Sequence, residues 1–181
     1  MTRPAALTLA LSLALTAQTA AAETVHFCWT GANGYTMTGR MDVPDRLMSN
    51  AVLTEDHIDA FKIAGYRNGQ LLGTWDMTQA GRGTTFHLRF DPVGMRFLTG
   101  GSYPSTYSQG WNADGTVEDC GEGGFGFNSG NYAQDVCLNG TWLADSSIDP
   151  ATPLIAGLQP VDATCSTVQM MSKSPKPNHF D

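Results

Sequence analysis

Four aromatic side chains lie in a part of the sequence that is otherwise rich in Gly, Ser and Asn. They are Tyr103, Tyr107, Trp111 and Tyr132. Exposed rings beside amide and hydroxyl groups can stack on sugars, so these residues are candidate contacts for a carbohydrate. The alternative is that the rings fill a thin core in this Gly-rich region, and the residues alone favour that interpretation.

The acidic side chains, 17 Asp and Glu in all, offer a second kind of chemistry. A pair of carboxylates can cleave a glycosidic bond, and all-β folds host this reaction. With this many acids, some pair will always have a suitable separation, and the sequence spacing does not identify any one pair as catalytic. A secreted polysaccharide hydrolase or lyase using a carboxylate pair is therefore the alternative function.

The acids near residue 114 resemble a calcium loop at first sight. Alignment with an EF-hand puts Asn112 and Asp114 at ligand positions, but it puts Gly110 and Gly121 at the first and last ones. Glycine has no side-chain oxygen, so an EF-hand is excluded. An Asp-Gly turn beside solvated acids is the favoured interpretation. The candidates for another kind of calcium site are Asp114, Glu118, Asp119 and Glu122.

The other catalytic residue types do not combine into a known pattern. The four histidines show no HExxH spacing, no serine lies in a GxSxG elbow, and no phosphate-binding Gly loop precedes a helix. His26 and His87 fall in predicted strands, where a structural histidine is more common than a ligand. We therefore expect no catalytic residues, no metal and no cofactor, which favours a protein that is not an enzyme.

The first 22 residues have the features of a signal peptide. A positive start at Arg3 precedes an apolar run over 5–15 and a small-residue cleavage site at 20–22. The run is too short for a membrane span, and no later segment approaches one. Removing Arg3 leaves nine Lys and Arg against 17 Asp and Glu, a net charge of −8. This balance disfavours nucleic acid as a partner, and we expect a periplasmic or secreted protein.

The four cysteines of an exported chain predict two disulfides, for which three pairings exist. There is no CxxC spacing, which removes the signature of thioredoxin-like chemistry and of common zinc sites. Proximity along a Gly-rich span favours Cys120–Cys137. Elimination then gives Cys28–Cys165.

Alternation of apolar and polar residues dominates from residue 24 to about 99 and predicts β-strands. Residues 35–43 alternate throughout, and Asn33-Gly34 joins them to the strand at 25–29. Matching apolar faces predicts a three-residue loop at 67–69 and a four-residue loop at 91–94. The predicted neighbours are Phe61 with Trp75, and Leu88 with Phe97. The predicted core comprises Val25, Phe27, Trp29, Tyr35, Met37, Met41, Phe61, Ile63, Trp75, Phe86, Leu88, Phe90 and Phe97.

Short antiparallel strands without a long helix predict an all-β fold, best described as a β-sandwich, with a closed β-barrel as the alternative. A single domain is expected over 23–171, followed by a flexible tail over 172–181.

A soft resemblance covers about residues 25–100. The segments 53–63 and 68–77, together with Phe27-Cys28-Trp29-Thr30-Gly31, resemble exported bacterial proteins of the PEP-CTERM-associated type. The chain lacks their C-terminal Pro-Glu-Pro motif, membrane span and basic end. The resemblance implies an exported β-rich domain and carries no functional residue. With no catalytic constellation and four loop aromatics, the leading hypothesis is a non-enzymatic binding or envelope-associated module, with carbohydrate as the candidate ligand.

Overall fold

The computed structural model describes residues 21–49, 51–116 and 119–166. Within them the chain forms thirteen strands and four single turns of 3-10 helix. The strands are β1 (Ala22–Thr30), β2 (Tyr35–Pro44), β3 (Leu53–Thr54), β4 (Ala60–Arg67), β5 (Gln70–Asp76), β6 (Phe86–His87), β7 (Arg89–Asp91), β8 (Arg96–Phe97), β9 (Gln109–Trp111), β10 (Phe125–Ser129), β11 (Gln134–Leu138), β12 (Thr141–Trp142) and β13 (Leu154–Gly157). The 3-10 turns are η1 (Asp45–Leu47), η2 (Glu55–His57), η3 (Met77–Gln79) and η4 (Ala144–Ser146).

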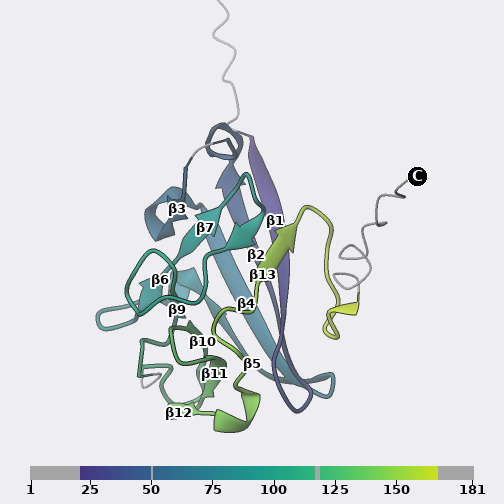
Figure 1. Cartoon of the computed structure of the whole chain (residues 1–181), viewed down its shortest axis with the longest axis vertical. Helices are drawn as coiled ribbons and strands as arrows, with labels where there is room; N and C mark the ends of the chain where they lie inside the picture. Colours follow the sequence, from purple (N-terminus) through teal and green to yellow (C-terminus); the bar gives the residue numbers. More distant parts are fainter. Residues whose placement is uncertain (1–20, 50, 117–118, 167–181) are drawn as a thin grey trace, which may run out of the picture.

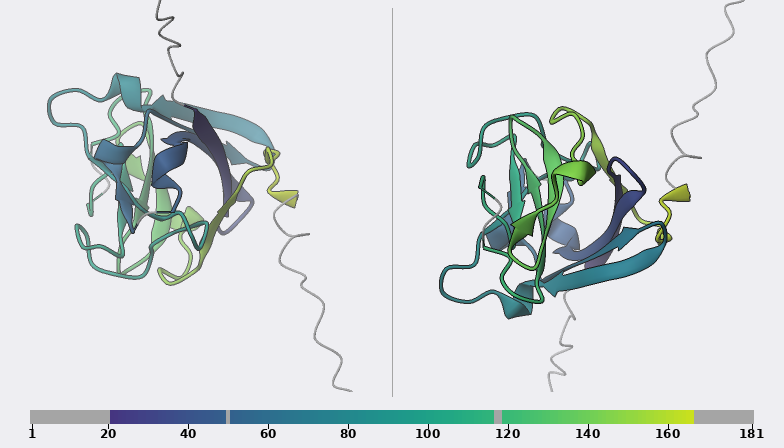
Figure 2. Two further views of the ribbon diagram at one scale, coloured as in Figure 1. Left: turned by 90° about the horizontal axis from the view of Figure 1, so that it is seen from above. Right: turned by 90° about the horizontal axis from the view of Figure 1, so that it is seen from below.

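Two antiparallel sheets pack face to face, as the sequence predicted for a β-sandwich (Figure 1). One sheet has eight strands in the order β3-β7-β8-β13-β1-β2-β4-β5, and the other has five in the order β12-β11-β10-β9-β6. The long strands β1, β2 and β4 curve around the shorter sheet (Figure 2). No helix among the described residues is long and apolar enough to cross a membrane. The predicted tail, and the predicted signal peptide except for its last two residues, lie outside the described residues.

Three Asn-Gly pairs close hairpins in this fold. The turns at 33–34, 68–69 and 139–140 have positive φ at both residues, between 50° and 79°. That is the conformation of a type I′ turn, whose twist suits the flanking strands. The predicted pairing of 25–29 with 35–43 is confirmed, since Val25 lies opposite Met41 and Trp29 opposite Met37.

The predicted register of the β4–β5 hairpin is wrong. Arg67 pairs with Gln70, so the loop has two residues, not three, and Trp75 lies opposite Ile63 instead of Phe61. A bulge beside Tyr66 shifts the register by one residue and so restores the agreement of apolar faces that the longer loop was meant to supply. Phe61 still contacts Trp75 diagonally, with ring centroids 6.2 Å apart.

The predicted register of the β7–β8 hairpin is also wrong, because the loop begins one residue later than predicted. Phe97 lies opposite Phe90 instead of Leu88, because the four-residue loop spans 92–95. The strand predicted over 85–90 is interrupted at Leu88, where the chain passes from the five-stranded sheet (β6) to the eight-stranded sheet (β7). His87, at the end of β6, is buried at this crossing.

Side chains satisfy the backbone where the chain changes sheets. The N–H of Leu88 donates to Glu55 Oε2 (3.0 Å), and the N–H of Arg89 donates to Gln109 Oε1 (3.0 Å). The Gln109 amide in turn donates to the carbonyls of Arg89 and Leu98 (2.9 and 2.7 Å). Because buried backbone groups without partners are costly, these bonds allow the strand to break inside the protein.

The core is a continuous layer of aromatic and aliphatic side chains between the sheets. Trp111 lies within 4.8–5.4 Å, between ring centroids, of Phe27, Phe61, Phe97 and Phe127. The predicted core residues are buried except Phe86, which is half-buried at the start of the short edge strand β6.

Both predicted disulfides are present, Cys28–Cys165 and Cys120–Cys137. The first fixes the segment 158–165 against the outer side of β1. The second fixes the loop before β10 to β11. No described cysteine is free, and two disulfides indicate an oxidising compartment.

Replacing Gly39 by Ala should lower the free energy of unfolding by about 1–3 kcal/mol. A Cβ at this position would overlap the ring of Phe27, which is fully buried among other rings and cannot move aside. Gly81→Ala is the matched control, because a Cβ there meets no atom within 4 Å. Urea denaturation measures both variants, and equal midpoints would contradict the close approach.

Titration of the unfolded, unreduced protein should find no free thiol, because all four cysteines are paired.

Reduction should cause the amides of β9–β12 to lose protection from hydrogen exchange before those of β1, β2 and β4, because the strands of the five-stranded sheet are short and Gly-rich. Its bridge closes a separation of 17 residues, worth roughly 3 kcal/mol on a chain-entropy estimate. Earlier loss of protection in β1 and β2 would show that the long strands are the weaker part.

Candidate functional site

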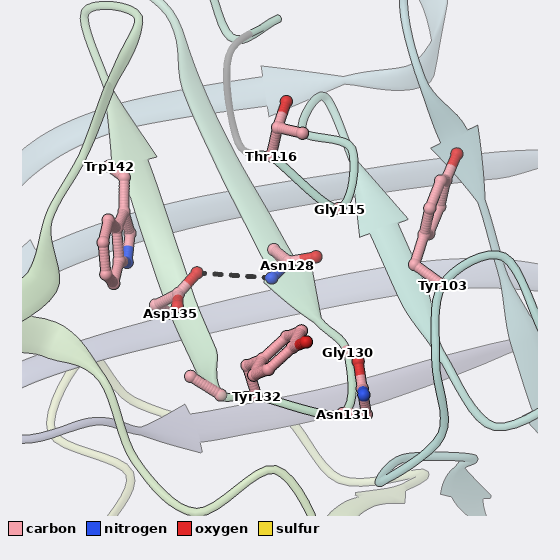
Figure 3. A pocket seen from close by; sticks show the side chains of 10 residues that line it. Tyr103, Gly115, Thr116, Asn128, Gly130, Asn131, Tyr132, Asp135 and Trp142 are labelled. Carbon is pink, nitrogen blue, oxygen red and sulfur yellow. Dashed lines mark hydrogen bonds between the residues drawn. The ribbon is translucent and has the colours of Figure 1, made fainter.

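A cavity of about 510 Å³ lies on the outer face of the five-stranded sheet, and two of the four predicted aromatic residues line it. Ligand pockets of small molecules fall in the range of about 300–1,000 Å³. The lining side chains come from β10, β11, β12 and the neighbouring loops (Figure 3). They belong to Tyr103, Thr116, Asn128, Asn131, Tyr132, Ala133, Asp135 and Trp142, and Gly115 and Gly130 complete the wall.

Strand pairing brings the polar residues of the cavity together. Asn128 on β10 lies directly opposite Asp135 on β11. Their neighbours Phe127 and Val136 point into the core, so alternation turns the amide and the carboxyl group outward. The turn between the two strands carries Tyr132, which is 91% exposed.

Trp142 reaches the cavity through the third Asn-Gly turn. The turn at 139–140 folds β12 back on β11, which places Trp142 opposite Cys137 and beside Asp135 on the outer face. Half of its surface is exposed. Figure 3 shows the indole and the Tyr132 ring on two sides of the Asp135 carboxyl group.

Tyr103 forms the other aromatic wall. A Cβ at Gly110 or Gly115 would lie 3.0 or 3.2 Å from its ring, so the absence of side chains at these glycines leaves the space that the ring occupies. His87 packs edge-on against it, with centroids 5.4 Å apart. Burial raises the pKa of the Tyr103 hydroxyl, and a hydrogen bond with the Thr85 side chain partly offsets this. The Tyr103 ring is therefore held in a fixed position.

Asp135 is the chemically distinctive group of the cavity. Its side chain is almost fully buried, and desolvation raises the pKa of the carboxyl group. Side-chain hydrogen bonds from Asn128, Trp142 and Ser147 oppose this shift. The bonds from Asn128 Nδ2 (3.5 Å) and Ser147 Oγ (3.4 Å) are long, so they compensate the burial only in part.

Asn128 supplies an unused acceptor beside this carboxyl group. Its amide nitrogen is directed at Asp135, whereas its Oδ1 atom is buried and has no hydrogen-bond partner in the described part of the chain. In Figure 3 that oxygen points toward the side of the cavity formed by Gly115 and Thr116. A buried acceptor without a partner is costly, and a ligand hydroxyl would satisfy it.

The predicted aromatic residues divide into three groups. Tyr103 and Tyr132 line the cavity. Tyr107 is 57% exposed but lies outside the lining. The expectation for Trp111 is wrong, because it is fully buried at the centre of the core and cannot contact a surface ligand.

Asn128, Asp135 and Trp142 were missed by the sequence analysis. Asn139-Gly140 is the same turn signal as Asn33-Gly34, from which the first hairpin was predicted. A hairpin at that position would have placed Trp142 beside β11.

Two further arrangements of residues do not form a chemical site. The described residues contain no group of three His, Cys, Asp or Glu side chains able to hold a metal ion, and Glu118 lies outside them. His87 Nε2 lies 3.2 Å from Ser108 Oγ. Ser108 is fully buried, and its hydroxyl donates to the carbonyl of Ser105 (2.9 Å), so this pair braces the loop and is closed to a substrate.

Comparison of the chain with protein-family models, curated proteins and solved structures gives no match. The assignment of a function therefore depends on the geometry of the cavity.

Asp135→Asn should raise the urea midpoint at pH 7. The folded state raises the pKa of this carboxyl group, so folded protein holds the proton to higher pH than the unfolded chain does. The stability that this proton brings is present below the unfolded pKa of about 3.9 and is lost as the pH rises through the folded value.

The advantage of Asp135→Asn over the parent protein should therefore shrink as the pH is lowered toward 4. Asp59→Asn, at an exposed carboxylate, is the control and should change little at either pH. A variant that is destabilised equally at both pH values would show that Asp135 serves as a structural acceptor instead.

Proposed function

We propose that the protein is an exported, non-enzymatic binding module of the periplasm or the extracellular medium, and that the cavity over β10–β12 binds a carbohydrate. The observation that carries the proposal is the combination of three exposed or half-buried rings, from Tyr103, Tyr132 and Trp142, with the polar pair Asn128 and Asp135 between them. The signal-peptide pattern and the two disulfides support export.

A sugar ring matches this lining on both of its surfaces. Its C–H face stacks on an aromatic ring, and its hydroxyl groups both donate and accept hydrogen bonds. A hydroxyl that donates to Asn128 Oδ1 would satisfy the buried acceptor, and a neighbouring hydroxyl would reach the Asp135 carboxyl group.

The charge of the lining favours a neutral sugar at this site. No Lys or Arg belongs to the described lining, and Asp135 contributes a negative charge when it is ionised. An acidic sugar would be repelled by that carboxylate without a compensating cation.

A hydrolase or lyase requires a second group beside Asp135. Two carboxyl groups of a glycosidase lie about 5–9.5 Å apart, whereas Asp135 is the one acid in the described lining. This supports a binding role over catalysis. An assay for new reducing ends on the retained polysaccharide tests it, and their release by the protein would favour the enzyme.

Trp142→Ala and Tyr132→Ala should each weaken retention on a neutral polysaccharide by about tenfold, which corresponds to a loss of about 1.4 kcal/mol of stacking free energy. Affinity electrophoresis across a panel of soluble neutral glucans, mannans, galactans and xylans measures the effect and identifies the sugar.

Tyr107→Ala is the matched control for these variants. It also removes an exposed tyrosine, but one that lies outside the cavity. Retention that falls equally in the control would indicate nonspecific adsorption to exposed rings. Absence of retention on every neutral polysaccharide would overturn the proposal.

A further inference from the structure

A second pocket lies on the opposite side of the sandwich, on the outer face of β1, β2 and β4. Its volume is about 200 Å³. Three basic side chains, from His26, Arg40 and Lys62, line it together with Thr38, Ala64 and Val161. Because it lies on the other sheet, its function is independent of the carbohydrate proposal.

The basic side chains form a row across three neighbouring strands. His26 on β1 is the cross-strand partner of Arg40, and Arg40 is the partner of Lys62 on β4. Adjacent strands are about 4.8 Å apart, so the row places three nitrogen-bearing side chains along roughly 10 Å. Arg40 and Lys62 are like charges at directly opposed positions, which destabilises a sheet, and Asp76 beyond Lys62 offsets this repulsion from one end of the row only.

Among the described residues, no carboxylate forms an ion pair with the side chains of this row. Arg67, Arg89 and Arg96 each form an ion pair, whereas Arg40 and Lys62 form none.

The two acids that border the row have other partners. Asp42 Oδ1 accepts a bond from the Thr24 hydroxyl (2.8 Å), and Asp76 Oδ1 accepts bonds from the N–H and hydroxyl of Thr78 (2.9 and 2.7 Å). A third acid, Asp162, follows the lining residue Val161 in the sequence, and its carboxylate accepts hydrogen bonds from the hydroxyls of Thr164 and Ser166. Asp76 is the cross-strand partner of Lys62 and interacts electrostatically with Lys62 and Arg40, but among the described residues neither cation is held in an ion pair.

The remaining side of the pocket is a wall built by a distant part of the chain. The segment 158–165 runs along the outer side of β1 (Figure 1). It is fixed there by the Cys28–Cys165 disulfide and by the Thr36 hydroxyl, which donates to the carbonyl of Ala163 (2.6 Å). Val161 of this segment lines the pocket together with the small side chains Thr38 and Ala64. The row of cations therefore borders a hollow instead of an open, flat surface.

We propose that this pocket binds an oxyanion group, that is, a carboxylate, sulfate or phosphate group. Arg40 offers a planar fork of N–H donors, Lys62 offers a point charge, and the Thr38 hydroxyl adds a neutral donor to the lining. On a protein with a net charge of −7 over the full sequence, a local cluster of cations is a specific attraction for such a group. The group belongs either to a free small anion or to an acidic sugar.

Amide chemical-shift titration of the ¹⁵N-labelled protein tests the proposal and separates the two sources. The probes are sodium sulfate, sodium phosphate and sodium glucuronate, each compared with sodium chloride at the same ionic strength, and glucose is the uncharged counterpart of glucuronate. We expect saturable shifts in the amides of 38–40 and 62–64 and of Val161. Saturation by all three anions indicates a site for free oxyanions, and saturation by glucuronate alone indicates an acidic sugar; either result supports the proposal.

Arg40→Gln and Lys62→Gln should raise the dissociation constant at least tenfold. Arg82→Gln removes the same charge from an exposed turn far along the chain and should leave the constant within twofold. Urea midpoints confirm that each variant is folded. The proposal is overturned if sodium chloride produces the same shifts as the oxyanions, if no shift saturates, or if the two variants titrate like the parent protein.

Discussion

The packing of the Trp111 ring is the contact on which the sandwich depends. The indole belongs to the five-stranded sheet and meets Phe27, Phe61 and Phe97 from the eight-stranded one, so it joins the two layers. Its inward direction also determines the outer surface. Since Trp111 points inward, its neighbour Gly110 faces outward, and the absence of a side chain there gives Tyr103 its seat beside the cavity. Core and candidate site thus lie on opposite faces of the five-stranded sheet.

Most of the fold could be predicted from local patterns, and the failures have a common origin. Alternation over 35–43 and the Asn-Gly pair at 33–34 specify a hairpin by themselves. At Asn68-Gly69 two arrangements bring the apolar faces into agreement, a three-residue loop or a two-residue loop with a β-bulge. The alternation of apolar and polar residues cannot distinguish between them. The break at Leu88 depends on Glu55 and Gln109, which are distant in sequence, so no local pattern reveals it.

The candidate site was less predictable because its residues come together only through the pairing of strands. Composition drew attention to Tyr103 and Tyr132, but it could not distinguish them from Trp111, since a ring among glycines serves equally well as core or as surface. Asp135 acquires its character only when Asn128 is placed opposite it and Trp142 beside it. The cationic row arises in the same way, from His26 and Lys62 meeting across Arg40. Sequence distance hides such groups.

The position of β13 has a consequence for how the chain acquires its structure. This strand lies between β1 and β8 and pairs with both, so residues 154–157 close a sheet whose other members precede them. These residues follow all the others of that sheet in the sequence. Until they arrive, β1 and β8 each present an unpaired edge to neighbouring chains. The contacts of β13 with β1 span more than a hundred residues, so we expect them to form late, and the open edges favour aggregation during this interval.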